Sequence, residues 1–454
     1  MSLVRTSVLL SAALALGVLS LQASLASAQV TAVRPERPER GLFKNPPVED
    51  GDRLDLNGSV GAGLDDNILL DLPGVSDPRV PAKSGSIATA SGGVSYNTTN
   101  SRGRLNASAS SAARYYPGQP IEHVTSHGAS LSGVALLTDR TSIYGSQSAT
   151  YQPFTFSLMF PTSFSPSYDP ESLPLIEATN PNFDQAATRT KYLSFLTTAG
   201  VSREFSKRTT FSASYHLDRS DTAYGTEPFT SQGASAGFRF SLTRGLGLRA
   251  GYGYQQAEYT LGAEPFRYHN IDLGVDYSKA LSFSRRTKLS FSTGSSAIND
   301  GSNTRFRAIG GAQLNHEIGR TWDATISYDR SFEFVSTLLQ PILYDALTAG
   351  VGGLVNRRVR VQTSAQASIG SIGIGDSTAV DNDFDMYQGN ATLSFALSRF
   401  LDLGATYSIY RYRFGADAVL PPNVERNVDR QSVSVYLSVW APVYSRTRRT
   451  NATR

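Results

Sequence analysis

The sequence predicts an all-β protein, a closed antiparallel barrel of about eighteen strands, from three observations. Short segments in which apolar and polar residues alternate recur from about Arg53 to Val443, and a period of two indicates strands with two different faces. Tight turns alternate with longer connections along the chain. No long apolar run occurs after residue 28. A closed sheet with lipid outside and water inside accounts for all three, so we expect a transmembrane up-and-down barrel.

The first 28 residues have the composition of an export signal peptide. Arg5 supplies one positive charge, residues 8–21 form a short apolar stretch, and residues 26–28 provide small side chains for cleavage. That stretch is too short for a permanent membrane helix. We expect a proline-rich periplasmic extension at 29–52, the barrel at 53–444 and a basic C-terminal tail at 445–454.

Composition excludes several classes of protein. The chain has no cysteine, which excludes disulfides, thiolate catalysis and a lipid-anchored mature N-terminus. A net charge of +4, from 42 basic and 38 acidic residues, gives no case for binding nucleic acid. A charged fraction of 18% is typical of a barrel that holds half of each strand in water. No cofactor is predicted.

Turn positions set the strand number and the orientation. Tight turns are expected near Asn100, Asp139, Ser206, Arg244, Phe283, Arg320, Arg357 and Arg399. Longer connections lie between them, so the pattern implies eighteen strands with both termini periplasmic. The longest connection, 158–188, carries several prolines interleaved with aromatic residues. It either folds into the lumen or packs over the mouth of the barrel.

Two hairpins predict the register residue by residue. A turn centred on Arg244 sets aromatic and small residues against each other on the lipid face, with Arg239 opposite Arg249 on the lumen face. A turn around Arg320 gives the outward pairs Ile318–Trp322, Leu314–Ile326 and Ala312–Tyr328, and the inward pair Glu317–Asp323. The faces stay consistent along both hairpins.

The faces expected to line the lumen carry charges of both signs. The basic residues are Arg104, Arg239, Arg249, Lys288, Arg305, Arg307 and Arg360, and the acidic residues are Asp272, Asp276, Glu317, Asp323 and Asp402. Either this wall selects solutes by charge, or the charges pair and only brace a wet lumen. Arg239 opposite Arg249 requires water or an aspartate of the next strand nearby.

Two other groups of residues have side chains typical of a calcium site or of a hydrolase site. Asp381, Asp383 and Asp385 are spaced two apart, as in calcium-binding loops, but no glycine or glutamate stands where an EF-hand needs it. The alternative is a solvated acidic loop. His127 beside Ser126 and His269 beside an asparagine have partners only in sequence, so we expect no enzyme and rank a barrel hydrolase last.

The segment Gly63-Leu64-Asp65-Asp66-Asn67-Ile68-Leu69 resembles the tyrosine-Asp-Asp-Asn-hydrophobic signature of the β-barrel porin 2 group. Leu64 replaces the usual aromatic residue. The resemblance implies an outer-membrane barrel with a porin-like or export-associated role, since that group is often found with exopolysaccharide and protein-sorting systems. No binding residues follow from it.

The sequence therefore predicts a channel in the outer membrane of a Gram-negative bacterium, for small hydrophilic solutes or polysaccharide. A structural or adhesive barrel is the alternative. The expected partners are outer-membrane lipid, lipopolysaccharide and the barrel-assembly machinery, which would recognise a closing strand at residues 433–440. A TonB-coupled receptor is disfavoured because it needs about 22 strands and a folded plug.

Overall fold

The computed structural model describes residues 51–67, 84–118, 123–155, 186–222, 228–259, 265–281, 284–299, 304–334, 341–373, 382–418, 420 and 426–447. The chain divides into two units, Met1–Glu39 and Arg40–Arg454, and every described residue belongs to the second. The expected signal peptide, most of the proline-rich extension and residues 158–185 of the longest connection lie outside the described residues.

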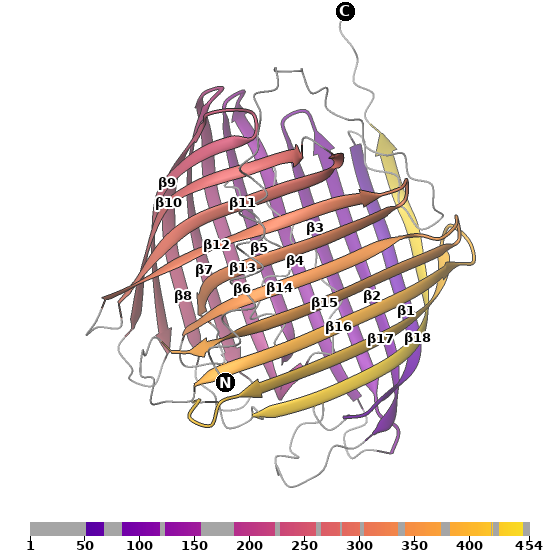
Figure 1. Ribbon diagram of the computed structural model, residues 1–454. Helices are drawn as coiled ribbons and strands as arrows, with labels where there is room; N and C mark the ends of the chain where they lie inside the picture. Colours follow the sequence, from indigo (N-terminus) through magenta and orange to yellow (C-terminus); the bar gives the residue numbers. More distant parts are fainter. Residues whose placement is uncertain are drawn as a thin grey trace, which may run out of the picture. The chain divides into compact units, whose positions relative to one another are not determined.

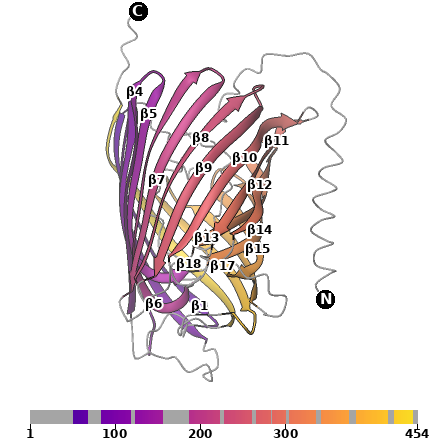
Figure 2. The ribbon, with the colours of Figure 1, turned by 90° about the vertical axis from the view of Figure 1, so that its left-hand side faces the viewer.

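The described residues form one closed antiparallel sheet of eighteen strands (Figures 1 and 2). The strands are β1 (Gly51–Asp65), β2 (Gly85–Asn100), β3 (Gly103–Tyr115), β4 (His123–Thr138), β5 (Thr141–Thr155), β6 (Ala186–Ser206), β7 (Thr209–Thr222), β8 (Phe229–Ser241), β9 (Leu246–Tyr259), β10 (Phe266–Leu281), β11 (Ser284–Asn299), β12 (Thr304–Ile318), β13 (Trp322–Phe334), β14 (Pro341–Leu354), β15 (Val359–Ile372), β16 (Asp383–Ala396), β17 (Leu401–Phe414) and β18 (Asn427–Thr447). Each strand pairs with the next, and β1 pairs with β18. The predicted barrel is confirmed. In the described part of the chain no helix has the length and apolarity to cross a membrane.

Short turns and longer connections alternate around the sheet, as predicted. The short turns follow the even-numbered strands from β2 to β16, and only the one near Phe283 lies outside the described residues. Gly51 pairs with Thr447, so β1 begins and β18 ends at the same rim as these turns. We call this rim the short-turn end and the opposite rim the loop end. Gly319, in the turn before β13, has φ of +61°, a conformation that glycine adopts without steric cost.

Both predicted hairpin registers are confirmed. Phe238 pairs with Ala250 and Arg239 pairs with Arg249. Every pair expected around Arg320 is also present. A short turn fixes the register because a slip of one residue would move every apolar side chain to the other face.

The outer face of the barrel carries an apolar belt. Large apolar side chains from strands around the sheet are exposed there, including Leu131, Phe238, Ile326, Leu393 and Val435, each 49–52% exposed. Soluble monomers do not expose apolar surface that runs around the whole molecule. The belt therefore requires an apolar surrounding medium, and a lipid bilayer provides one.

Closure of the sheet depends on the pairing of β1 with β18. Their register runs from Gly51 opposite Thr447 to Asp65 opposite Ser432. A β-bulge interrupts it between Leu54 and Asp55, next to Pro442. Proline has no N–H to donate to the ladder, so a bulge is the position in a sheet where it is tolerated.

A buried ion pair joins the two strands at the loop end of this seam. Nη2 of Arg430 on β18 lies 2.6 Å from Oδ2 of Asp65 on β1, with side chains 1% and 0% exposed. A guanidinium nitrogen of Arg114 on β3 lies 3.9 Å from the same carboxylate. The backbone N–H of Gln431 donates to Oδ1 of Asp66 at 2.7 Å. Asp65 and Asp66 therefore connect β1 to β18 where the sheet closes.

We expect Asp65→Asn to lower the free energy of unfolding by about 3–5 kcal/mol, because it removes the carboxylate that the buried guanidinium of Arg430 contacts. The matched control is Asp323→Asn, since Asp323 is an exposed carboxylate on the lumen face, and it should cost about 0.5 kcal/mol or less. Urea unfolding in lipid vesicles measures both. Equal stabilities of the two variants would show that the pair does not hold the seam.

The register also predicts which single cysteines, introduced into this cysteine-free chain, meet water. In vesicles, a water-soluble maleimide should label cysteines that replace Arg239, Arg249 and Gln362 on the lumen face. It should not label cysteines that replace Phe238, Tyr252 and Val435 on the lipid face. Mass spectrometry gives the extent of labelling, and equal labelling of both sets would contradict the register.

Candidate functional site

Hydroxyl and amide side chains line the lumen between the two rims. Ser59 and Ser91 lie opposite each other on β1 and β2, and their hydroxyl oxygens are 2.7 Å apart. The contact recurs across other strand pairs at 2.6–3.2 Å: Ser108–Ser130, Thr150–Ser194, Ser214–Ser235, Thr325–Asn315, Gln388–Gln366, Asn390–Ser408 and Thr392–Thr406. We call these residues the hydroxyl wall. Each keeps further donor or acceptor capacity for water or a polar solute.

The charges predicted to line the lumen gather mostly near the short-turn end. The strand bounds place nine of them within about five residues of a short turn: Arg104, Arg239, Arg249, Lys288, Arg360, Asp276, Glu317, Asp323 and Asp402. Arg307 lies near the loop end of β12. The side chains of Arg305 and Asp272 are outside the described part of the structure.

Arg239 and Arg249 share the carboxylate of Asp276 on β10. Nη1 of Arg249 lies 2.5 Å from Oδ1, and Nε of Arg239 lies 3.6 Å from Oδ2. Arg249 also donates to the carbonyl oxygen of Thr293 at 3.1 Å. The Asp276 side chain is 3% exposed, whereas that of Arg239 is 32% exposed. The trio carries a net charge of +1, and Arg239 is its accessible member.

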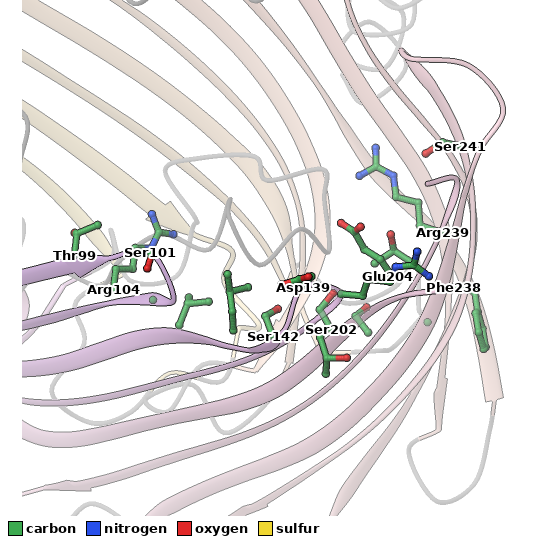
Figure 3. A pocket seen from close by; sticks show the side chains of 18 of the residues that line it. Thr99, Ser101, Arg104, Asp139, Ser142, Ser202, Glu204, Phe238, Arg239 and Ser241 are labelled. Carbon is green, nitrogen blue, oxygen red and sulfur yellow. The ribbon is translucent and has the colours of Figure 1, made fainter. Parts of the chain in front are cut away.

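These charges border a hollow of about 590 Å³ against the inner wall at the short-turn end. Residues of β2 to β9 line it, including Arg104, Glu204 and Arg239. In Figure 3, Arg239 and Glu204 extend from the wall into the hollow, while Phe238 lies on the other side of β8. Glu204, which the sequence analysis did not single out, offsets part of the positive charge.

The remaining predicted charges around the same rim include both signs. Asp402 on β17 interacts electrostatically with Arg360 on β15. Glu317 and Asp323 lie opposite each other in the β12–β13 hairpin. Some of the predicted charges therefore pair, while Arg239 and Asp323 remain accessible to water.

At the loop end of β14–β18 the inner face of the sheet is apolar, whereas the sequence predicts a polar lumen wall. A buried apolar cluster centred on Tyr344, Phe384, Met386, Tyr410 and Tyr412 occupies this sector, and no member of that group is more than 6% exposed. Ala418 and Leu420, from the connection after β17, pack with the cluster. This part of the lumen wall is covered rather than lined by water.

In this sector apolar residues face inward and charged residues face outward, the reverse of the arrangement elsewhere in the barrel. On β16, Tyr387 and Leu393 point outward and are 48% and 50% exposed, so Phe384 and Met386 point into the barrel. Charged residues take the outer face, where Arg411 of β17 forms an ion pair with Asp429 of β18. A small hydrophobic core therefore lies inside the barrel at its loop end.

Two of the three aspartates considered as a calcium site lie on this charged outer face. Asp383 and Asp385 lie on the outer face of β16, whereas Asp381 is outside the described residues. Nothing in the described part of the chain brings together three or more side chains able to hold a metal ion.

The histidines do not assemble hydrolase geometry. Nδ1 of His127 lies 2.9 Å from the hydroxyl of Ser111 rather than contacting Ser126. Nδ1 of His269 lies 2.7 Å from the hydroxyl of Tyr252. No histidine in the described ranges contacts both a hydroxyl and a carboxylate, the arrangement that a catalytic triad requires.

No family model and no curated protein matches this chain. Several solved structures are similar to it in fold. OccK2 (OpdF) of Pseudomonas aeruginosa, solved in complex with glucuronate, has a TM-score of 0.45 at 9% identity over 87% of this chain and 98% of that chain. The BenF-like porin from Pseudomonas fluorescens Pf-5 has a TM-score of 0.43 at 8% identity, over 89% and 100%. The siderophore receptor PirA from Pseudomonas aeruginosa has a TM-score of 0.41 at 9% identity, over 86% and 81%.

Proposed function

We propose that the protein is a porin-like channel of a Gram-negative outer membrane that passes small hydrophilic solutes. The observation that carries this proposal is the hydroxyl wall, which lies inside a closed sheet of eighteen strands with an apolar outer face. Barrels of 16–18 strands are wide enough to hold an aqueous channel. Neutral hydroxyl and amide groups hold water at the wall and exchange it readily for a polar solute.

Uncharged polar molecules are the solute class that this wall fits best. Its side chains offer both donors and acceptors, which match the hydroxyl groups of sugars. On the lumen face near the short-turn end, fixed charges of both signs lie close together, so their fields largely cancel over a Debye length of about 8 Å. The proposed channel is therefore only weakly selective between anions and cations.

The proposed orientation has short turns and both termini in the periplasm, as in bacterial barrels generally. Lipopolysaccharide and phospholipid would then surround the apolar belt, and the barrel-assembly machinery would insert the chain through its closing strand. An association with exopolysaccharide or other export is a finer proposal that rests on the resemblance of the Asp65 segment alone.

A structural or adhesive barrel without transport is the second candidate, and the buried cluster at the loop end favours it. Tyr344, Tyr410 and Tyr412 cover one sector of the lumen with side chains at most 2% exposed. If other parts of the chain cover the remaining sectors, no continuous water path is left. Conductance decides between the two candidates.

In planar bilayers we expect ohmic conductance with weak ion selectivity. Ser364→Cys places a thiol on the lumen face of β15, where Ser364 is exposed, and a bulky water-soluble thiol reagent should lower its single-channel current. Ala365→Cys, the next residue on the opposite face, is the matched control and should keep its current. An inserted, folded barrel that passes no current would refute the channel and favour the structural candidate.

Asp276→Asn should shift the selectivity toward anions, because it removes the carboxylate that Arg239 and Arg249 share. The reversal potential in a salt gradient measures this shift, which high salt should weaken by screening. Glu317→Gln is the comparison on the same rim. A selectivity identical to that of the unmodified protein would mean that this trio lies outside the conducting path.

A further inference from the structure

The short turns of the barrel are basic. Every short connection among the described residues carries Arg or Lys, with the pairs Lys207-Arg208 and Arg357-Arg358 in two of them and single arginines in the others. Asp139 is the one acidic residue in those described connections. All these basic side chains are exposed, and none forms an ion pair with another described residue. We call them the basic turn ring.

By sequence, none of the longer connections between strands carries a net positive charge. Residues 156–185, between β5 and β6, contain Asp169, Glu171, Glu177 and Asp184 and no lysine or arginine. The basic character is therefore specific to the short turns rather than a property of all connections. A charge pattern that follows one rim indicates a negatively charged partner at that rim.

The ring lies directly beyond the aromatic edge of the apolar belt. Phe205, 51% exposed, lies two residues before Lys207, and its ring packs against that of Phe238 on the outer face, with centroids 6.5 Å apart. The guanidinium carbon of Arg203 lies 5.4 Å from the centre of the Phe205 ring on the same outer face. Aromatic side chains mark the boundary between hydrocarbon and headgroups. Arginine and lysine next to them reach the level of the lipid phosphates.

We propose that the basic turn ring binds the phosphate groups of anionic phospholipids in the leaflet at the short-turn end. This rests on the membrane placement under the proposed function but does not require that the barrel conducts. Guanidinium groups bind phosphate oxygens in bidentate geometry. The basic residues are spread over successive turns around the rim, which fits an annulus of lipids better than one docked acidic protein.

Trp322 provides a local reporter for this contact. It begins β13, directly after the Arg320 turn, and lies on the outer face opposite Gly353 at the end of β14. Its Nε1 donates to the carbonyl oxygen of Leu354 at 3.0 Å, which holds the indole beside the turn that contains Arg357-Arg358. The other of the chain's two tryptophans, Trp440, lies on the lumen side opposite Asn57.

The experiment uses the full-length protein in vesicles of phosphatidylcholine and phosphatidylglycerol, with one lipid brominated at a time. Quenching of tryptophan fluorescence then gives the relative affinity for the two lipids. We expect about fivefold preference for phosphatidylglycerol at low salt, falling toward equal affinity in 1 M salt. The triple variant Arg320→Gln, Arg357→Gln, Arg358→Gln should lose the preference.

The matched control removes three exposed arginines near the loop end, Arg219→Gln, Arg411→Gln and Arg413→Gln, and should keep the preference. No preference in the unmodified protein, or equal preference in both triple variants, overturns the proposal. The proposal would also be overturned if the protein in detergent bound soluble polyglutamate but showed no lipid preference in vesicles. That result would assign the ring to an acidic polypeptide. Conductance recorded on the same preparations separates the two proposals, because current without lipid preference defeats only this one.

Discussion

Every backbone N–H and C=O in the hydrocarbon layer must find a partner within the sheet, so the whole barrel depends on the pairing of its first and last strands. The buried pair of Asp65 and Arg430 adds specificity to that pairing. Burying two charges gains little stability in itself, but a wrong register would leave each of them buried alone, at a cost of several kcal/mol. The seam therefore has one register that is much better than its neighbours.

The sequence predicts local registers well and the seam poorly, for a physical reason. Arg239 opposite Arg249 follows from a short turn and strict alternation, both of which lie within a few residues. Asp65 and Arg430 are 365 residues apart, and no local pattern states which residues of the first and last strands meet. The segment that contains Asp65 resembles a family signature, whereas its role in closure follows only from the closed sheet.

The sequence itself indicates the sector at the loop end in which apolar residues face the lumen. Tyr410, Tyr412 and Phe414 alternate with Arg411 and Arg413, so the apolar face changes sides before β17 ends. The lumen residues predicted from the sequence are all charged, so this apolar sector is not among them. Fourteen residues at about 3.3 Å each, tilted by about 45°, rise about 33 Å, whereas the apolar band of such barrels is about 25 Å tall. The strand ends therefore leave the lipid and pack by the rules of a soluble protein.

Single side chains of the hydroxyl wall can be replaced without loss of the fold. Because a hydroxyl rotates to donate or accept, the partner of Ser59, Ser108 or Ser214 can still satisfy itself with water when its neighbour is replaced. Stability comes instead from the lipid-facing belt and the seam, on other residues. Charged residues can therefore be introduced on this wall one at a time without loss of the fold, so the electrostatic character of the lumen can change independently of the stability of the barrel.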